Sequence, residues 1–487
     1  MAETNYSRTV IQYAISSRIL LLTLIVLWRS LLNPYDTSAS INPNCLSISS
    51  ESTKPPIIFP SVASAIEDSI VWDSVYFVRI AQCGYEYEQT YAFFPLLPIL
   101  IFLLSNSVFW PLIPVIGYRA VLGLSGYVIS NVAFVFAALS LYRLSLVILK
   151  DPNASLRASV LFCFNPASIF YSSIYSESLY ALLSIGGTYL LMSGVNNVPA
   201  LLFALSGSVR SNGVLNAGYY GFKALHQSYY AMYVKKRPHL VLKVLLAGAL
   251  RCICIFIPFL AFQAYGYYNI CHGRNPEEMR PWCKAKIPLL YGFIQSHYWG
   301  VGFLQYFQLK QIPNFLLASP VLSLAFCSIL SYWKADPENF FLLGFRTTLK
   351  KKYTPAFLFS GGEEPVRDDN HSAAKKEAIN VRRRQKSISQ DRSASPSKNQ
   401  ISVSGYHSAI VLPFVFHLSF MTATAFFVMH VQVATRFLSP SPPLYWFASY
   451  LMTSAGKSRL WAHLVWAYAA SYILLGSLLF SNFYPFT

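Results

Sequence analysis

The sequence predicts an all-α protein that crosses a membrane several times. Of its 487 residues, 54% are hydrophobic and only 12% are charged, whereas a soluble protein of this size carries about a quarter charged residues. Several apolar runs reach the roughly 20 residues that an α-helix needs to span a bilayer. A single polytopic bundle over residues 1–487, with about 8–10 transmembrane helices, can therefore account for the whole chain.

The expected membrane segments follow one another with polar breaks between them. They lie at about residues 18–32, 94–116, 120–142, 156–170, 178–194, 197–209, 241–264, 314–333, 406–430 and 460–481. The three segments within 156–209 are short and are interrupted by Asn-Pro, Gly-Gly and Asn-Asn-Val-Pro sequences. Irregular backbone at membrane depth is tolerated where it lines a cavity or is buried in protein. This region is therefore predicted to form the wall of a polar cavity.

The net charge is +18, and the largest group of basic residues lies in one loop rather than over a whole surface. The loop 334–405 holds repeated Lys and Arg residues, and the positive-inside rule places such a loop in the cytosol. Its central part is rich in Lys, Arg, Ser and Asp and is expected to be disordered. The N-terminus, with Arg8 and Arg18, is assigned to the cytosol for the same reason. Charge confined in this way argues against binding to nucleic acid.

Three loops are assigned to the opposite side of the membrane, the first because it holds only Lys54 and Arg79 and the others by the alternation of crossings. They are residues 33–92, 265–313 and 431–459. A simple count of crossings also places Arg143, Lys150 and Arg157 on that far side, which strains the assignment.

Four of the eight cysteines lie in these far-side loops, namely Cys45, Cys83, Cys271 and Cys283. The favoured disulfide is Cys271–Cys283 because both residues belong to one loop, although sequence alone does not fix the pairing. No zinc pattern and no phosphate-loop, dinucleotide or hydrolase motif occurs. No metal is therefore expected.

Asp73 is the first candidate for a group that does chemistry. It stands beside Trp72 with no Lys or Arg within five residues, just before a long apolar segment. Residues 68–83 are predicted to form an amphipathic helix at the membrane surface, and a carboxylate in its first turn is favoured by the helix dipole. The structural alternatives are that Asp73 caps this helix or pairs with Arg79.

Two further polar clusters interrupt apolar sequence. Tyr175 and Glu177 stand among several Ser residues, a combination that suits sugar hydroxyls or an ion. The alternative is a helix break in which Glu177 caps the next helix. Arg210 and Asn212 follow another apolar segment. The guanidinium could bind a phosphate in a bidentate manner, or it could reach toward lipid headgroups as arginines at membrane boundaries do.

The last clusters lie in the far-side loops. His430, Gln432 and Arg436 follow an apolar segment, and Arg436 is either a second phosphate ligand or a membrane anchor. Trp299 belongs to an aromatic stretch that could stack on sugar rings. Aromatic residues also form the interfacial belt found at membrane boundaries, which is the alternative here.

At these clusters the chain resembles the PIG-V family, mannosyltransferases of glycosylphosphatidylinositol (GPI) anchor synthesis, in a form that looks like that of plants. Matches run nearly from end to end. They comprise Trp72-Asp73 with Tyr76-Phe77, Ala92–Pro95, Tyr175–Glu177, Val209–Gly213, Pro281–Cys283, Tyr298–Leu304, Gln311–Leu317 and Met429–Leu438. The charged insert in loop 334–405 and a shortened segment after Trp446 depart from the family pattern. Neither departure is expected to touch the candidate site.

The resemblance implies a GT-C membrane bundle in the endoplasmic reticulum with a lumenal active site. It implies dolichyl-phosphate mannose as donor, with no certain cofactor. The acceptor would be a mannosyl-glucosaminyl-(acyl)phosphatidylinositol that receives a second, α-1,6-linked mannose. A small membrane accessory subunit is left open. The alternatives are a transporter or scramblase of lipid-linked sugars, a noncatalytic subunit, or another GT-C mannosyltransferase. A transporter should show pseudo-symmetric halves, and the sequence shows none clearly.

Roles for single residues follow from this chemistry. The donor linkage is β and the product α, so one displacement inverts C1, with Asp73 as the base that takes the acceptor proton. Arg210 and Arg436 would stabilise the departing phosphate. Position and chemistry suggest substrate binding by Trp72, Tyr175, Glu177, Asn212, Trp299, His430 and Gln432. The same reasoning places Phe93, Phe94 and Pro95 at the entrance for the carrier lipid.

Overall fold

The computed structural model is a bundle of α-helices joined by short 3-10 turns. It describes residues 2–35, 45–46, 57–275, 277, 279–345, 405–453 and 458–484. No strand occurs among these residues. The all-α class is therefore confirmed, whereas the central part of loop 334–405, expected to be disordered, lies outside the described residues.

The α-helices divide the chain into many short and a few long elements. They are α1 (Ala2–Leu31), α2 (Pro60–Asp68), α3 (Asp73–Cys83), α4 (Leu96–Asn106), α5 (Ile113–Ile116), α6 (Tyr118–Leu149), α7 (Pro152–Cys163), α8 (Ser168–Ser172), α9 (Glu177–Met192), α10 (Asn197–Val209), α11 (Ala217–Tyr229), α12 (Pro238–Cys271), α13 (Leu290–Trp299), α14 (Ile312–Ala335), α15 (Pro337–Phe341), α18 (Leu412–Phe427), α19 (Ala434–Leu438), α20 (Pro442–Leu451) and α21 (Ser458–Ser481).

Shorter helices connect these elements. The 3-10 turns are η1 (Glu88–Ala92), η2 (Trp110–Leu112), η3 (Ser211–Asn216), η5 (Pro281–Lys284), η6 (Leu309–Gln311), η7 (Ala409–Val411) and η8 (Val431–Val433). A π-helical turn, η4 (Tyr230–Val234), ends α11.

Six of the described helices are long and apolar enough to cross a membrane, namely Asn5–Leu31, Tyr118–Leu149, Pro238–Cys271, Leu309–Ala335, Ala409–Phe427 and Arg459–Ser481. A seventh span is formed if α4 and the segment Trp110–Ile116 are counted as one, although the two are bent by 69° relative to each other. These segments make the chain a multi-pass membrane protein. The remaining predicted segments, within 156–209, form helices that are too short for that test because polar breaks interrupt them.

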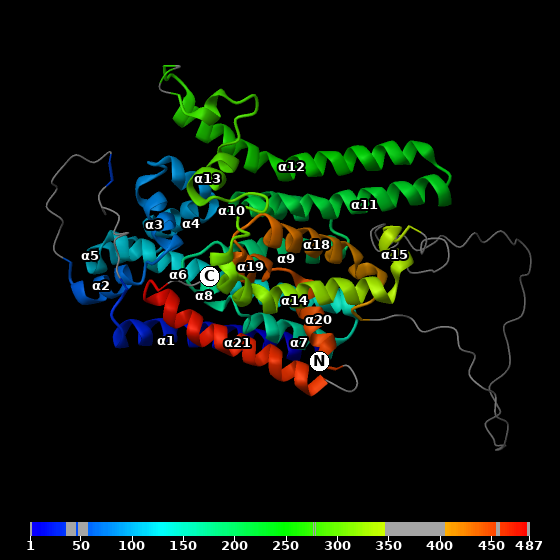
Figure 1. Cartoon of the computed structure of the whole chain (residues 1–487), viewed down its shortest axis with the longest axis horizontal. Helices are drawn as coiled ribbons and strands as arrows, with labels where there is room; N and C mark the ends of the chain where they lie inside the picture. The colour runs from blue at the N-terminus through cyan, green and yellow to red at the C-terminus, as the bar shows by residue number, and fades with distance from the viewer. Residues whose placement is uncertain are drawn as a thin grey trace, which may run out of the picture.

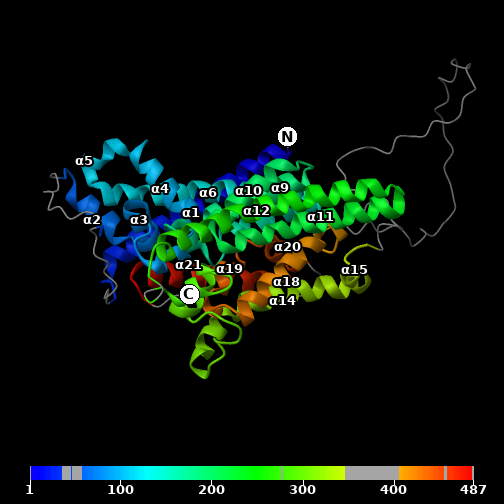
Figure 2. The ribbon, with the colours of Figure 1, turned by 90° about the horizontal axis from the view of Figure 1, so that it is seen from above.

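The bundle is layered between two helix pairs. Figure 1 shows α1 and α21 side by side along one edge and α11 and α12 side by side along the opposite edge. Between them lie α6, α9 and α10, and Figure 2 shows α14 and α18 packed together on a further side. Aromatic side chains fill the interior, with Trp446, Tyr142 and Tyr171 among the largest that are fully buried. Helices α11 and α20 are absent from the predicted membrane segments because both are short.

The predicted break after α7 is held by an arginine of the first helix. Asn165 accepts the amide of Ala167 and donates to the carbonyl of Phe162, which ends α7. Arg18, only 3% exposed, donates to the carbonyls of Cys163 and Ser168 at 3.1 Å each. Cys163 is the last residue of α7, so its carbonyl has no partner within that helix. Arg18 is therefore a buried structural residue of α1, not the flanking topogenic charge that the sequence suggested.

The amphipathic helix predicted over 68–83 is present as α3, but it begins five residues later than expected. α2 ends at Asp68, and α3 begins at Asp73 after a turn that contains Trp72, whose φ is 54°. A positive φ is unusual for a residue with a side chain and is found where surrounding contacts impose it. The contacts of Trp72 with the C-terminal helix, described below, supply that constraint.

The predicted far-side loop 431–459 also needs correction. Only its first part, with η8 and α19, lies beside the cavity described below. α20 is almost wholly buried, and the ring of Tyr450 near its end contacts that of His407 at 5.0 Å. His407 belongs to the end of the bundle that carries the basic loop. The later part of 431–459 therefore returns to the side assigned to the cytosol. Arg157, which bonds Ser449 at 3.2 Å, lies there too, so its positive charge no longer strains the topology.

Two disulfides stabilise the other end of the bundle. Cys271–Cys283 is confirmed, and Cys45–Cys83 joins the first far-side loop to the end of α3. All four cysteines that the sequence placed outside the cytosol are thus paired.

Candidate active site

One cavity of about 420 Å³ collects almost all the predicted site residues. Its walls come from the start of α3, the α8–α9 junction, the end of α10 with η3, α13, the η8–α19 region and the end of α21. The predicted residues that line it are Trp72, Asp73, Phe93, Phe94, Tyr175, Glu177, Arg210, Asn212, Trp299, His430, Gln432 and Arg436. The far-side loops and the predicted cavity wall within 156–209 therefore meet at one place.

Asp73 opens into this cavity from the first turn of α3. Its side chain is 32% exposed, and one carboxylate oxygen accepts a hydrogen bond from Arg436 Nη1 at 2.9 Å. Its backbone N–H donates to the hydroxyl of Tyr175 at 3.1 Å. Asp73 makes no side-chain capping bond to α3, and Arg79 pairs with Glu86 instead. Both structural alternatives for Asp73 are therefore excluded.

Glu177 lies deeper and is only 2% exposed. Its Oε1 accepts a short hydrogen bond from Arg210 Nη1 and lies 3.7 Å from Arg436 Nε. Its Oε2 is buried and has no hydrogen-bond partner. Glu177 begins α9 but makes no capping bond, so the capping alternative is excluded here as well. Buried polar atoms in native proteins normally have partners, so an unpaired oxygen in a cavity wall marks a place for a ligand group.

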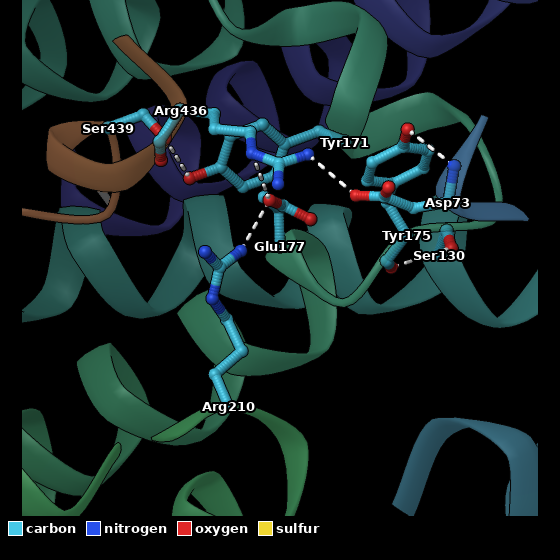
Figure 3. Close-up of polar contacts among 8 residues, drawn as sticks. All are labelled: Asp73, Ser130, Tyr171, Tyr175, Glu177, Arg210, Arg436 and Ser439. Carbon is cyan, nitrogen blue, oxygen red and sulfur yellow. Dashed lines mark hydrogen bonds and ion pairs between the residues drawn. The ribbon is translucent and has the colours of Figure 1, made fainter. Parts of the chain in front are cut away.

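Figure 3 shows these four charged residues in one alternating row. Asp73, Arg436, Glu177 and Arg210 follow one another, and Arg436 bridges the two carboxylates. Formal charges therefore cancel within the row. The two carboxylates outweigh the effect of burial and raise the pKa of Arg436 above its ordinary value, which keeps this guanidinium charged.

Arg436 is held in place from several sides. Its guanidinium lies 5.3 Å from the ring centre of Phe170 and 5.5 Å from that of Tyr175. The Tyr171 hydroxyl donates to Ser439 Oγ at 2.9 Å, and Ser439 Oγ donates to the carbonyl of Arg436 at 2.7 Å (Figure 3). These contacts fix α19 against α8, so the bridge to Asp73 is preorganised.

The motif around Arg210 requires a glycine. A Cβ at Gly213 would lie 2.3 Å from the backbone carbon of Ser206 and 2.4 Å from the nitrogen of Gly207. Backbone atoms cannot move aside cheaply, so η3 can press against α10 only where residue 213 lacks a side chain. Asn212, 8% exposed, lines the cavity and has a buried Nδ2 without a hydrogen-bond partner.

Aromatic side chains form the wall above the charged row. Phe93 stacks on Tyr76 with ring centres 4.6 Å apart and meets Trp299 edge-on at 6.5 Å. Phe94 lines the cavity with only 2% of its surface exposed. Pro95 is the exception among the predicted residues. It caps the N-terminus of α4 and does not line the cavity, so the predicted entrance is reduced to the two phenylalanines.

His430 and Gln432 reach the cavity from the η8 region. The ring of His430 stacks on Tyr306 at 4.6 Å, and Gln432 Oε1 accepts a bond from the Tyr306 hydroxyl at 2.8 Å. Asn314 of α14 donates to the same hydroxyl at 2.8 Å. Tyr306 therefore sets the orientation of both side chains.

Several lining residues were missed by sequence reasoning. Tyr291 and Gln295 precede Trp299 by eight and four residues on α13, and all three line the cavity. Residues four apart share a helix face, so this spacing could have identified them. Phe480 carries no such signal. It lines the cavity, and its carbonyl accepts a bond from Trp72 Nε1 at 3.1 Å. The expectation that the segment after Trp446 does not touch the site was therefore wrong.

Possible metal ligands come together at one place in the part of the chain that the structure describes. The one grouping of possible ligands there is Cys45, Cys83 and Glu86. The two cysteines form a disulfide, and Glu86 accepts bonds from Arg79 and from the amide of Leu46. The two sulfur atoms and the Glu86 carboxylate oxygens therefore already have bonding partners.

The site can thus accept a proton at Asp73, attract an anion through two arginines and hold a polyhydroxylated ring between polar and aromatic walls. A family model described as Mannosyltransferase (PIG-V) matches residues 7–487. The chain belongs to this family, which confirms the resemblance drawn from the motifs and makes the protein a glycosyltransferase.

Similar proteins carry more particular names. GPI alpha-1,6-mannosyltransferase 2 of Homo sapiens is 29% identical over 476 residues, which cover 91% of this chain and 84% of that protein. GPI mannosyltransferase 2 of Drosophila melanogaster is 28% identical over 455 residues, 85% of this chain and 86% of that protein. GPI mannosyltransferase 2 of Aspergillus oryzae is 31% identical over 312 residues, 60% of this chain and 66% of that protein. No solved structure matches the chain.

Proposed function

We propose that this mannosyltransferase adds the second, α-1,6-linked mannose to a GPI precursor in the endoplasmic reticulum. The donor is dolichyl-phosphate mannose and the acceptor is a mannosyl-glucosaminyl-(acyl)phosphatidylinositol. The family membership and the names of the relatives support the reaction class. The observation that supports the mechanism is that Asp73, about one third exposed, lies beside Arg436 at the cavity end of a row of alternating charges.

Asp73 acts as the general base of an inverting displacement. The acceptor oxygen forms its bond to C1 of the mannose as the bond from C1 to the donor phosphate breaks, and the hydroxyl proton passes to Asp73. Arg436 donates a hydrogen bond to one carboxylate oxygen of Asp73, and the other oxygen of Asp73 faces the cavity. A carboxylate so fixed meets the acceptor hydroxyl without reorganisation, which lowers the barrier.

The two arginines stabilise the phosphate while they keep their carboxylate partners. A guanidinium has five N–H donors, and the described contacts of Arg210 with Glu177 use one of them. The remaining donors of Arg210 and Arg436 can reach the charge that the phosphate gains as it leaves. Glu177 Oε2 and Asn212 Nδ2, both unpaired, would bond sugar hydroxyls.

A lumenal active site is supported by the disulfides. Cys83 ends the helix that begins with Asp73, and Cys283 lies in the segment that leads to α13, so both disulfides belong to the cavity end of the bundle. Disulfides persist in the oxidising lumen and are rare in the cytosol. Maleimide labelling of a cysteine introduced at Ser64, before and after permeabilisation, tests this orientation. Labelling in the intact endoplasmic reticulum from the cytosolic side would contradict it.

The reaction is tested with Asp73→Asn in cells that lack the chain. The variant should be made and inserted normally, fail to transfer mannose, and leave a one-mannose GPI precursor to accumulate. The matched control is Asp68→Asn on α2, whose carboxylate bonds Ser64 and does not line the cavity. It should restore mature anchors. Normal transfer by Asp73→Asn would exclude the proposed base, and mature anchors in cells without the chain would exclude the step.

A further inference from the structure

A second carboxylate cluster lies beside the cavity without lining it. Glu88, at the start of η1, accepts hydrogen bonds from three residues that follow it by about 200 positions. Arg280 Nε lies 3.1 Å from each carboxylate oxygen, Trp282 Nε1 donates at 2.7 Å, and the Tyr298 hydroxyl donates at 2.7 Å. The Glu88 side chain is only 12% exposed. Both oxygens are thus occupied, by two partners from the loop between α12 and α13 and by one from the end of α13.

These partners lie next to a wall of the cavity. Tyr298 directly precedes Trp299 at the end of α13, and this helix presents Tyr291, Gln295 and Trp299 to the cavity. Arg280 precedes the turn η5 and Trp282 lies within it, and Cys283 of the same turn is bonded to Cys271. The Glu88 carboxylate therefore joins the first far-side loop to both ends of the segment that carries α13.

An apolar contact also joins α13 to η1 of the first far-side loop. Tyr91 of η1 is 2% exposed and packs in one cluster with Trp282, Leu290 and Ile294. Beneath it, Gly266 of α12 approaches so closely that a Cβ there would lie 2.3 Å from the side chain of Leu290. Apolar packing sets how closely α13 approaches α12 and η1, but such packing is not directional. Hydrogen bonds to Glu88 are directional and fix the rotation of the helix about its axis.

We propose that Glu88 is a positioning residue that sets α13 so that Trp299 forms the wall against a substrate mannose ring. The inference rests on the proposed function, because it assigns the ligand of this wall. Glu88 does not touch the substrate. It acts through Tyr298 and the adjoining Trp299, whose ring is supported on its other side by Phe93. A mannosyl ring occurs in both donor and acceptor, and either one could meet this wall.

The test measures kinetics of the purified full-length enzyme with dolichyl-phosphate mannose and the one-mannose GPI precursor. In Glu88→Gln one carboxylate oxygen becomes an NH2 group, which cannot accept a hydrogen bond from the Arg280 guanidinium. We expect α13 to rotate as a result, so that the KM of one substrate rises about tenfold while kcat stays within about threefold. The substrate whose KM changes identifies the ring at the wall. Trp299→Ala should raise the same KM.

The double variant separates positioning from general stabilisation. If Glu88 acts through Trp299, Glu88→Gln should add little to the KM of Trp299→Ala, because the wall that it orients is already gone. The matched control is Glu67→Gln, which also removes a carboxylate paired with an arginine, Arg119 at 3.9 Å, but away from the cavity. Its KM values should equal those of the wild type.

Other outcomes would overturn the inference. Additive effects of Glu88→Gln and Trp299→Ala, or unchanged KM values for both substrates in Glu88→Gln, would show that Glu88 does not act through this wall. Should Glu88→Gln fail to fold, Tyr298→Phe removes only a hydroxyl, with its bond to Glu88 and the one it accepts from Arg280. This variant must still raise the same KM by a smaller factor, or the inference fails. Absence of transfer by the wild-type enzyme would instead refute the proposed function.

Discussion

Two carboxylate–arginine clusters stand close together in this protein and differ in one respect. In the Glu88 cluster both carboxylate oxygens have partners, and the cluster does not line the cavity. In the row of Asp73, Arg436, Glu177 and Arg210, one oxygen of Glu177 is buried and unpaired, and Asp73 faces the cavity. A fully paired carboxylate builds structure. A carboxylate with an oxygen that has no partner, or that faces the cavity, can bind or react with a ligand.

The largest expected effect comes from Glu177→Gln. Both arginines lose their shared partner inside the protein, so the free energy of unfolding should fall by about 3–5 kcal/mol. The value of kcat/KM should fall by about 10²–10³-fold. Adding Arg210→Met to this variant should recover stability, measured by thermal unfolding in detergent, without recovering mannose transfer. Recovery of both would mean that the row serves the fold alone.

Arg436→Lys comes next. A lysine ammonium is a single point charge and cannot bridge Asp73 and Glu177 as the guanidinium does, so kcat/KM should fall by about 10²-fold. Arg280→Lys, at the fully paired cluster, is the control. Glu88 keeps Trp282 and Tyr298 as donors there, so the change should stay within about threefold. Equal losses in the two variants would remove the distinction between the clusters.

A smaller effect on stability is expected from Gly213→Ala. The added Cβ would overlap the backbone of Ser206 and push η3, and with it Arg210, from α10. The cost should be about 1–3 kcal/mol, with reduced transfer. Gly218→Ala is the control, because nothing lies within 4 Å of its added Cβ in the first turn of α11. It should stabilise the protein by about 0.5–1 kcal/mol.

The smallest effect concerns pH. Burial would raise the pKa of Glu88, but the bonds from Arg280, Trp282 and Tyr298 outweigh it and hold the pKa below its ordinary value. The stabilisation is therefore present above the pKa of the unfolded state, about 4.3, and is lost as the pH falls through the lower folded value. Thermal unfolding between pH 6 and pH 3 should show this loss, and Glu88→Gln should lack it. An identical profile in that variant would assign the acid sensitivity to other groups.

The sequence was sufficient for the fold class and for most of the cavity. Apolar runs located the helices, and charges that interrupt them located Asp73, Glu177, Arg210 and Arg436. The pairing of these residues could not be derived. Asp73 and Arg436 are 363 positions apart, and no periodicity links distant helices. Glu88 was not singled out, because the donors that define its role lie about 200 positions further along the chain.

The sequence-based predictions were wrong where the same local pattern of residues is compatible with two different structures. Arg18 resembles a flanking cytosolic charge, yet it is buried because broken backbone within reach needs donors. Residues 68–83 have a helical period throughout, yet the chain turns at Trp72 because the C-terminal helix holds that side chain. Loop 431–459 has a single basic residue, Arg436, in its first half, and the buried α20 within it is too short to read as a membrane segment.

The bond from Trp72 to the carbonyl of Phe480 also bears on how the enzyme is made. These residues are 408 positions apart, so the ribosome synthesises nearly all of the protein between them. Until α21 has entered the membrane, the turn before Asp73 lacks the partner that imposes its conformation, and the cavity lacks one wall. The growing chain therefore carries its reactive carboxylate in an unfinished site. A chain that stops before residue 480 would be inserted with the charged row present but without the contact that orients its first member.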